Sequence, residues 1–325
     1  MRRLLLAIAV AASWPAASWA LDPVLFQANW LIQGENAYMV AGIKNGVYRD
    51  EGIDLSIVRG FGSGDTVKKV VTGAAMVGTA DVGVIMMAVV RESLPVKCIS
   101  TEYTYSPQGV WTLKSSGIDS IKKLTGAHFG ITVGNSLSIY FPLLAKANGL
   151  DPNSVTFVTM EASALLPTLL AGKIDAMPGF ATNFDLRNAE ATAQGKPMLD
   201  MPMAASGVVV NGECEFVTDT TIAKQGDLLK RYLRANRKAL EWSRDHPEET
   251  GHITAAAYPE LDEKQVVINH EAYMHYVFND MSAKVGVGGF DLAELKTTFD
   301  AAKAAQNLTS DADVATFIDT RFLPK

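Results

Sequence analysis

Strand-like and helix-like patterns alternate along the N-terminal third of the chain. Short apolar runs alternate with segments whose apolar residues recur at helical spacing. These patterns predict strands at 24–30, 54–58, 80–85 and 96–101, and helices at 35–45, 65–72 and 86–92. A βαβ rhythm of this kind is typical of an α/β layer with a mostly parallel sheet flanked by helices.

The same rhythm starts again after a break at 105–109. It predicts helices at 119–124, 136–148 and 164–170, and strands at 129–133, 155–159 and 174–177. We therefore expect two lobes, the second being inserted into the first. Residues 21–110 and 206–325 would form lobe 1, and residues 111–205 would form lobe 2. The segments near 103–110 and 205–212 would then be the two crossovers.

Beyond residue 220 the pattern becomes helical. It predicts an amphipathic helix over 228–242 and further helices at 263–279, 291–305 and 311–320, packed on lobe 1 and away from any binding site. A chain of 325 residues is also too long for one ordinary core, which agrees with two domains.

The first twenty residues have the pattern of a secretory signal. Arg2 and Arg3 precede the apolar run 4–12, and small residues stand at Ser18 and Ala20. The run is too short to span a bilayer, which needs roughly 20 residues. We therefore expect residues 1–20 to be cleaved and the mature protein to be periplasmic. A retained anchor and a buried first helix are the alternatives.

Charge and cysteine content narrow the class of protein. Without residues 1–20, 29 Lys+Arg against 35 Asp+Glu becomes 27 against 35, a net charge of −8. An acidic chain without a basic patch argues against nucleic acid and anionic membranes as partners. Cys98 and Cys214 form either one disulfide or two buried thiols.

No pattern for catalysis or for a cofactor stands out. The sequence has no GxSxG, HExxH or Walker motif, and no Cys/His cluster with zinc spacing. The five histidines are isolated from one another: His128, His246, His252, His270 and His275. We therefore expect a protein that is not an enzyme and that uses no cofactor and no metal.

Candidate binding residues follow the ends of the predicted strands. In open α/β sheets, ligands bind beyond the carboxyl ends of the strands, where turns lead into helix N-termini. In lobe 1 this rule selects Trp30, Gln33, Asn36, Tyr38, Gly62 and Ser63, and in lobe 2 it selects Asn135 and Ser136. Each has a purely structural alternative, because Ser, Asn and Gly are also common in tight turns and caps, and Trp and Tyr in cores.

Four further candidates lie on a crossover or in lobe 2. Tyr103 stands where the chain leaves lobe 1, as either a hinge packing residue or a cleft wall. Glu161, Phe180 and Asn183 follow predicted strands of lobe 2. The Glu161 carboxylate would accept a hydrogen bond from a ligand amine, unless it is simply a solvated surface group.

Several motifs in a fixed order resemble one protein family. They are Trp30 followed by AGIKNGVYRDEGIDL at 41–55, GSGD at 62–65, VVTG at 70–73, GTADVG at 78–83 and LLAGKIDA at 169–176. Together they resemble the SsuA/THI5-like (NMT1-like) solute-binding proteins over roughly residues 24–245. The resemblance implies a type II periplasmic-binding fold that clamps a small molecule between two lobes and delivers it to the permease of an ABC importer. By position it puts Trp30, Ser63, Asn135 and Glu161 on the cleft loops, and we expect a monomer.

Members of that family bind chemically different ligands, so the resemblance leaves the ligand open. No Lys or Arg lies in the four main cleft turns, whereas aromatic residues lie in or beside them. This favours a planar aromatic or heterocyclic ligand (pyrimidine-like, flavin-like or an aromatic acid) over a sulfonate, taurine or nitrate. The alternatives are such an anion binder, an extracellular sensor module, and an enzyme of thiamin pyrimidine synthesis, whose cysteine-rich motif the chain lacks.

Overall fold

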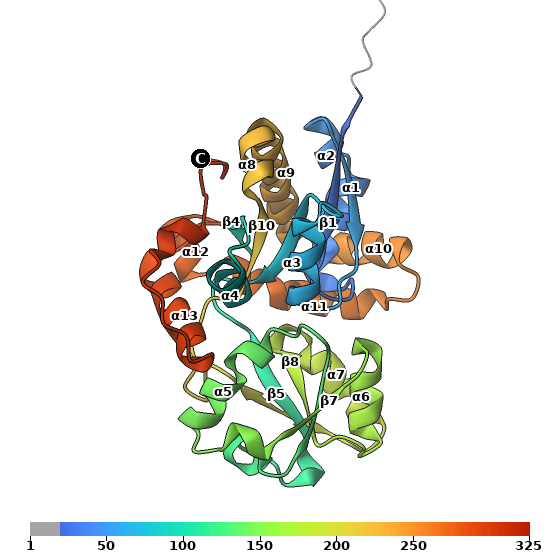
Figure 1. Ribbon diagram of the computed structural model, residues 1–325. Coiled ribbons are helices and arrows are strands. Elements are labelled where there is room, and N and C mark those ends of the chain that lie inside the picture. Colours follow the sequence, from blue (N-terminus) through green and yellow to red (C-terminus); the bar gives the residue numbers. More distant parts are fainter. Residues whose placement is uncertain (1–19) are drawn as a thin grey trace, which may run out of the picture.

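The computed structural model describes residues 20–325. The expected signal sequence therefore lies outside the described residues, except for Ala20. Figure 1 shows two α/β lobes stacked one above the other, with the chain passing between them more than once. Within residues 20–325, no helix combines the length and the apolar character that a membrane span requires.

Lobe 1 is built on a five-stranded sheet. Its strands lie in the order β2-β1-β3-β10-β4. Their bounds are Asp22–Gln27 (β1), Ile53–Val58 (β2), Val77–Asp81 (β3), Val96–Thr101 (β4) and Glu213–Thr218 (β10). Since β10 is antiparallel to both of its neighbours, the other four strands all point the same way.

Lobe 2 repeats this topology. Its strands lie in the order β7-β6-β8-β5-β9. Their bounds are Gln108–Leu113 (β5), His128–Ile131 (β6), Thr156–Thr159 (β7), Ala176–Phe180 (β8) and Met198–Pro202 (β9). Again one strand, β5, runs against the other four. The predicted fold class, two lobes with mostly parallel sheets flanked by helices, is confirmed. The chain crosses between the sheets at 102–107 and 203–212.

The helices are distributed unequally between the lobes. Lobe 2 carries α5 (Leu137–Ala147), α6 (Ala162–Leu170) and α7 (Ala181–Ala193). The others follow strands of lobe 1: α1 (Ala37–Lys44), α2 (Val47–Asp50), α3 (Ser63–Val71), α4 (Val82–Glu92), α8 (Asp219–Lys224), α9 (Gly226–Asp245), α10 (Pro247–Ala257), α11 (Glu263–Val277), α12 (Asp280–Val285) and α13 (Leu292–Ala305). Helices α9, α11 and α13 confirm three C-terminal predictions. However, α13 packs on both α4 and α5, so it contacts lobe 2 as well as lobe 1.

Three element predictions were wrong. The segment 119–124 contains only a 3-10 turn at Ile121–Leu124. The segment 80–85 is not a strand, because β3 ends at Asp81 and the Asp81 carboxylate accepts the N–H groups of Gly83 and Val84, starting α4. The segment 311–320 contains only a 3-10 turn at Val314–Phe317, followed by a parallel bridge from Ile318 to the edge strand β4. Pairing with that open sheet edge competes with continuing a helix.

The two cysteines form a disulfide, which decides between the alternatives of the sequence. Cys98 in β4 and Cys214 in β10 lie on neighbouring strands, with their Cα atoms 5.7 Å apart. The sequence separation of 116 residues includes all of lobe 2. The bridge therefore joins the two ends of the inserted lobe at the point where both enter lobe 1.

Candidate functional site

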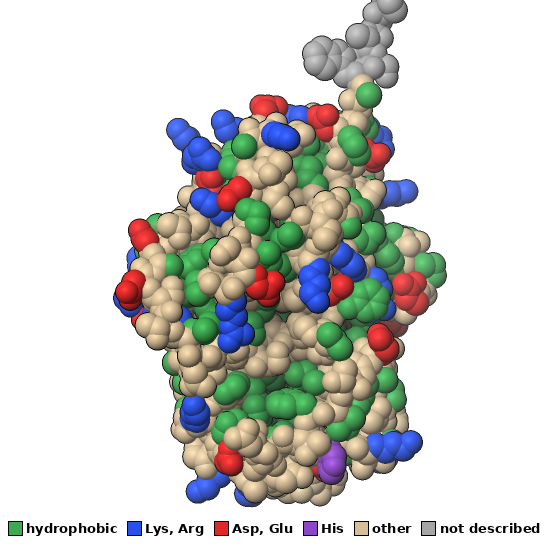
Figure 2. All heavy atoms as spheres, viewed as in Figure 1, with side chains coloured by type: hydrophobic (Ala, Val, Ile, Leu, Met, Phe, Trp, Pro, Cys, Tyr) green, Lys and Arg blue, Asp and Glu red, His purple; other side chains and the backbone are tan. Residues whose placement is uncertain are grey.

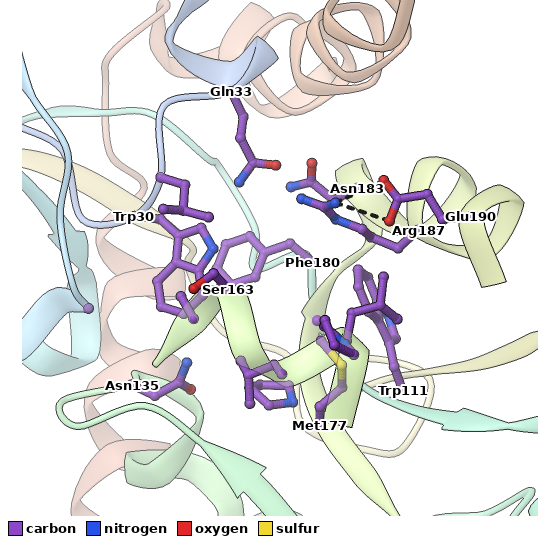
Figure 3. Close-up of a pocket in the computed structure, with 18 of the residues that line it drawn as sticks. Trp30, Gln33, Trp111, Asn135, Ser163, Met177, Phe180, Asn183, Arg187 and Glu190 are labelled. Carbon is purple, nitrogen blue, oxygen red and sulfur yellow. Dashed lines mark hydrogen bonds and ion pairs between the residues drawn. The ribbon is translucent and has the colours of Figure 1, made fainter. Parts of the chain in front are cut away.

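A cavity of about 530 Å³ lies between the two lobes. Lobe 1 lines it with the turns that follow β1 and β2 and with the start of β10, and lobe 2 lines it with β8, α6, α7 and the turn before α5. Figure 3 shows Trp30 and Gln33 from lobe 1 facing Phe180, Asn183 and Arg187 from lobe 2 across this space. The volume is within the range of about 300–1,000 Å³ that is typical of small-molecule sites.

Eight of the twelve candidate residues line the cavity. They are Trp30, Gln33, Gly62, Ser63, Asn135, Ser136, Phe180 and Asn183. The structure brings them together because four of the five strands of each sheet point their carboxyl ends towards the junction of the lobes. Trp30 also packs against the apolar cluster of lobe 2 that contains Trp111, so it spans the junction.

The other four candidates lie outside the lining. Tyr38 is buried in the core of lobe 1, where its hydroxyl lies 3.4 Å from Glu215. The Asn36 side chain accepts the backbone N–H of Gln33 and so holds the turn before α1. Glu161 is exposed at the N-cap of α6. Tyr103 is buried on the first crossover and packs edge-on against Phe180, so it supports the cavity wall from behind.

The sequence analysis missed several lining residues. They are Asn29, Glu35 and Glu213 in lobe 1, and Trp111, Ser163, Met177, Arg187, Glu190 and Lys196 in lobe 2. Trp111 and Glu213 lie on β5 and β10, the two strands that follow the crossovers, and no strand was predicted at either place. Arg187 and Glu190 lie on α7, for which no helix was predicted. Glu35 belongs to a turn that the sequence predicted, but whether its side chain points into the cavity depends on the tertiary structure.

The carboxyl groups on the lobe 1 wall lie in a low-dielectric environment. Burial raises the pKa of Glu35 to about 7, against the opposing effects of Asn183, Tyr103 and Arg187. Burial also raises the pKa of Glu213, with further contributions from Glu102 and other acids. The Asn29 amide donates to Glu213, and the Asn183 amide donates to Glu35 across the lobes at 3.4 Å. Near neutral pH these groups therefore act as hydrogen-bonding groups more than as fixed negative charges.

Cationic groups reach the cavity from α7 and from the loop after it. Arg187 donates from Nη1 to both carboxylate oxygens of Glu190, at 3.1 and 3.3 Å. Lys196 donates from Nζ to the backbone carbonyl of Leu170 at 2.6 Å. The cleft turns contain no cation, as the sequence indicates, but the cavity wall does. Both cations already have partners within lobe 2.

The lobes also contact each other directly around the cavity. The Gly64 N–H donates to the carbonyl of Gly134 at 3.2 Å, joining the glycine turns of the two lobes. Gly62 has a φ of +121°, and a Cβ there would lie 2.9 Å from the Gly134 oxygen. On the far side, Asn269 of α11 donates to Thr182 of α7 at 2.9 Å. The lobes are therefore in a closed arrangement, in contact on two sides of the cavity. No cluster of potential metal ligands occurs within residues 20–325.

The repeated topology and the interlobe cavity define a two-lobed fold of the periplasmic-binding-protein type. The model of the NMT1/THI5-like family matches residues 33–250, and the chain belongs to this family. The resemblance in the motifs of the sequence is thus confirmed.

Relatives of the chain include both binding proteins and enzymes. It is 23% identical to the riboflavin-binding protein RibY of Chloroflexus aurantiacus, covering 88% of this chain and 82% of that protein. It is 27% identical to a 4-amino-5-hydroxymethyl-2-methylpyrimidine phosphate synthase of Legionella pneumophila, covering 72% and 73%. The alkanesulfonate-binding protein SsuA of Xanthomonas axonopodis, solved with bound MOPS, has the same fold, with a TM-score of 0.68 at 14% identity over 94% of this chain and 100% of that one.

Proposed function

We propose that the protein is the periplasmic solute-binding component of an ABC importer and that its ligand is a planar aromatic or heterocyclic molecule. The observation that carries the proposal is the interlobe cavity of about 530 Å³, whose walls include Trp30, Trp111 and Phe180. Aromatic faces favour planar ligands, because stacked or edge-on contacts add about 0.5–1.5 kcal/mol beyond burial of area.

The polar groups of the cavity support a ligand that donates hydrogen bonds. Glu35 and Glu213 present carboxyl oxygens, and the Asn183 side-chain oxygen is buried without a hydrogen-bond partner in the described structure. A ring N–H or an exocyclic amine would satisfy such acceptors. An anion such as a sulfonate or nitrate would instead meet the carboxyl groups of lobe 1. On lobe 2 it would meet the Arg187 guanidinium, which already pairs with Glu190, and the Lys196 ammonium, which already donates to the carbonyl of Leu170.

The size of the cavity supports a ligand larger than one small ring. Since a water molecule occupies about 30 Å³ in the liquid, 530 Å³ corresponds to roughly 18 water-sized groups. A two- or three-ring heterocycle fills such a space, and the relative RibY is named for a flavin. Together with the secretory pattern of residues 1–20, this favours an exported carrier of a heterocycle.

The residues of the chain give less support to the alternative that the protein is an enzyme. The synthases among the relatives justify testing it. However, the chain has only two cysteines, Cys98 and Cys214, and both are used in the disulfide. A cysteine-rich iron site is therefore not available, and the closed arrangement of two lobes agrees with capture of a ligand.

A thermal-shift screen of the mature protein tests the proposal directly. Because a ligand that binds the native state stabilises it by mass action, the melting temperature rises with ligand excess over Kd. We expect a rise with riboflavin or with amino-substituted pyrimidines, followed by a calorimetric Kd. A rise only with alkanesulfonates or nitrate would overturn the choice of ligand. Bound iron together with single-turnover formation of a pyrimidine phosphate would overturn the binding-protein role.

A further inference from the structure

The GTADVG motif at 78–83 has no role in the cavity lining, although it contains a buried acid at the junction of the lobes. Asp81 is 0% exposed and lies between β3 and α4. It does not line the cavity. Its backbone N–H donates to the Ser63 hydroxyl at 3.1 Å, however, and Ser63 does line the cavity. Asp81 therefore lies directly behind the lobe 1 wall.

The side chain of Asp81 joins three parts of the molecule. Oδ1 accepts the N–H groups of Gly83 and Val84 at the start of α4, at 2.9 and 3.2 Å. Oδ2 accepts the Gln108 amide at 2.8 Å, where the first crossover enters β5. Oδ1 also accepts the hydroxyl of Tyr140, on α5 of lobe 2, at 2.9 Å.

The contact with Tyr140 is tightly packed. Tyr140 is 0% exposed, and a Cβ at position 83 would collide with its hydroxyl oxygen. Glycine at position 83 is therefore what allows this hydroxyl of lobe 2 to reach Asp81. All the groups that hydrogen-bond to Asp81 are neutral, and burial raises the pKa of its carboxyl to about 7. Burying the Asp81 carboxyl costs desolvation energy. An aspartate that only capped α4 and stayed exposed to water would not have this cost.

The location of this contact links it to opening of the cleft. Tyr140 is one turn into α5, whose preceding residues Asn135 and Ser136 line the cavity. Asp81 lies next to Ser63, the residue that starts α3 on the opposite wall. If the two walls move apart by hinge motion, the N-terminus of α5 moves away from those of α3 and α4. The Asp81–Tyr140 bond must then lengthen, and the Asp81 carboxyl becomes hydrated.

We infer that Asp81 is a positioning residue whose hydrogen bond with Tyr140 stabilises the closed arrangement of the lobes and so sets the affinity of the cleft. Only the effect on ligand affinity rests on the proposed function, since closure itself can be measured without a ligand. A closed state that is more populated before binding lowers the apparent Kd by the same factor.

The test compares Tyr140→Phe with Tyr48→Phe in the ligand-free protein. Tyr48 is equally buried, and its hydroxyl donates to Asn236 at 2.8 Å within lobe 1. Both variants thus lose one buried tyrosine hydrogen bond, but only the first loses it between the lobes. In Tyr140→Phe we expect the ratio of closed to open molecules to fall about tenfold. Small-angle scattering should show a radius of gyration on the order of 1 Å above the roughly 19 Å of a compact chain of this size.

A conservative variant of Asp81 distinguishes its role in positioning the lobes from a role in packing alone. Asp81→Asn keeps an oxygen for Tyr140. Once the Gln108 amide turns over, the new amide nitrogen can donate to the Gln108 oxygen, which is buried without a partner in the parent. We expect this variant to scatter like the parent, whereas Asp81→Ala should behave like Tyr140→Phe. If Tyr140→Phe and Tyr48→Phe both keep the parent radius, or expand equally, the inference is overturned. Because no ligand is present, these outcomes do not depend on whether the proposed ligand class is correct.

Discussion

The two lobes share one strand order but differ in what surrounds their sheets. Lobe 1 carries the disulfide, the C-terminal helices and the buried acids Asp81, Glu213 and Glu215. Lobe 2 is covered by three helices and lines the cavity largely with apolar groups of α6 and β8. In Figure 2 the charged side chains are concentrated on the upper lobe, lobe 1, and the visible face of lobe 2 is largely apolar or uncharged.

This difference separates the scaffold from the chemistry of the site. The common topology brings the carboxyl ends of both sheets to one junction, which is what creates a cleft. The recognition groups depend on which side chains each lobe directs there. Lobe 1 supplies carboxyl and amide groups and the aromatic ring of Trp30. Lobe 2 supplies mostly aromatic and aliphatic groups, together with two asparagine amides, one ion pair and Lys196. The predictions below test whether the two lobes contribute unequally to stability and equally to binding.

The largest effect is expected from removing the disulfide of lobe 1. In the chain-entropy account, a bridge that closes a loop of 116 residues stabilises a protein by about 3–5 kcal/mol. The Cys98→Ala, Cys214→Ala double variant should lose about this much free energy of unfolding, measured in urea. Since Cys214 neighbours Glu213 in the cavity wall, ligand affinity should fall too. A loss below about 1 kcal/mol would show that lobe 1 does not depend on its bridge.

The buried acids of lobe 1 predict a pH dependence of stability. Burial raises the pKa of Glu215 from 4.5 to about 7, and its neighbour Glu102 is raised as well. The unfolded chain therefore loses protons from about pH 4.5, before the folded protein does. The contribution of these acids to the free energy of unfolding is fully present below pH 4.5, and it is lost as the pH rises towards 7.

Replacing Glu215 by glutamine should remove its share of this pH dependence. We expect Glu215→Gln to gain about 2–3 kcal/mol relative to the parent at pH 8 and little at pH 4. Asp200 of lobe 2 is the comparison, since burial raises its pKa from 3.8 to about 6. Asp200→Asn should shift stability less, and at lower pH. Parallel pH profiles for Glu215→Gln and the parent, from denaturation between pH 4 and 8, would contradict the prediction.

Binding, in contrast to stability, should depend on both lobes. Trp30→Ala and Phe180→Ala each remove one aromatic wall, from lobe 1 and lobe 2 respectively. Each should weaken the ligand found by the thermal-shift screen at least tenfold, about 1.4 kcal/mol, without unfolding the protein. Calorimetry provides the Kd, and far-ultraviolet dichroism provides the control for folding. Unchanged affinity in one variant would remove that lobe's aromatic residue from the site.

The smallest effect is expected from the surface ion pairs. Arg234 and Lys238 of α9 pair with Glu51, at 2.5 and 2.7 Å, and Arg234 makes the largest contribution in lowering the pKa of Glu51 to about 2. Glu51→Gln should cost at most about 1 kcal/mol at neutral pH and less at high salt. The cost should fall further as the pH drops from about 4.5 through about 2, where the parent carboxylate becomes protonated. A loss as large as that of the disulfide variant would contradict this ranking.

The regular elements were predictable where the local pattern was strong. The alternating strands and helices of 24–101, and the amphipathic helix within α9, follow from periodicity alone. Strands β5 and β10 were not predicted. Each lies inside its sheet, next to an edge strand, and is buried on both faces, and the short polar-apolar alternation at 213–216 was not recognised as a strand. The segment after Asp81 was mistaken for a strand, because a continuous apolar run fits a buried helix equally well.

The sequence by itself determined the two-lobed α/β class and eight residues of the cavity wall, since strand ends and the turns after them are local features. Only the tertiary structure decided the rest. It paired Cys98 with Cys214, directed Glu35 and Arg187 into the cavity, and brought Asp81 to Tyr140, 59 residues further along the chain. These contacts join residues of different elements, and their geometry depends on how the lobes pack, which no local period of the sequence encodes.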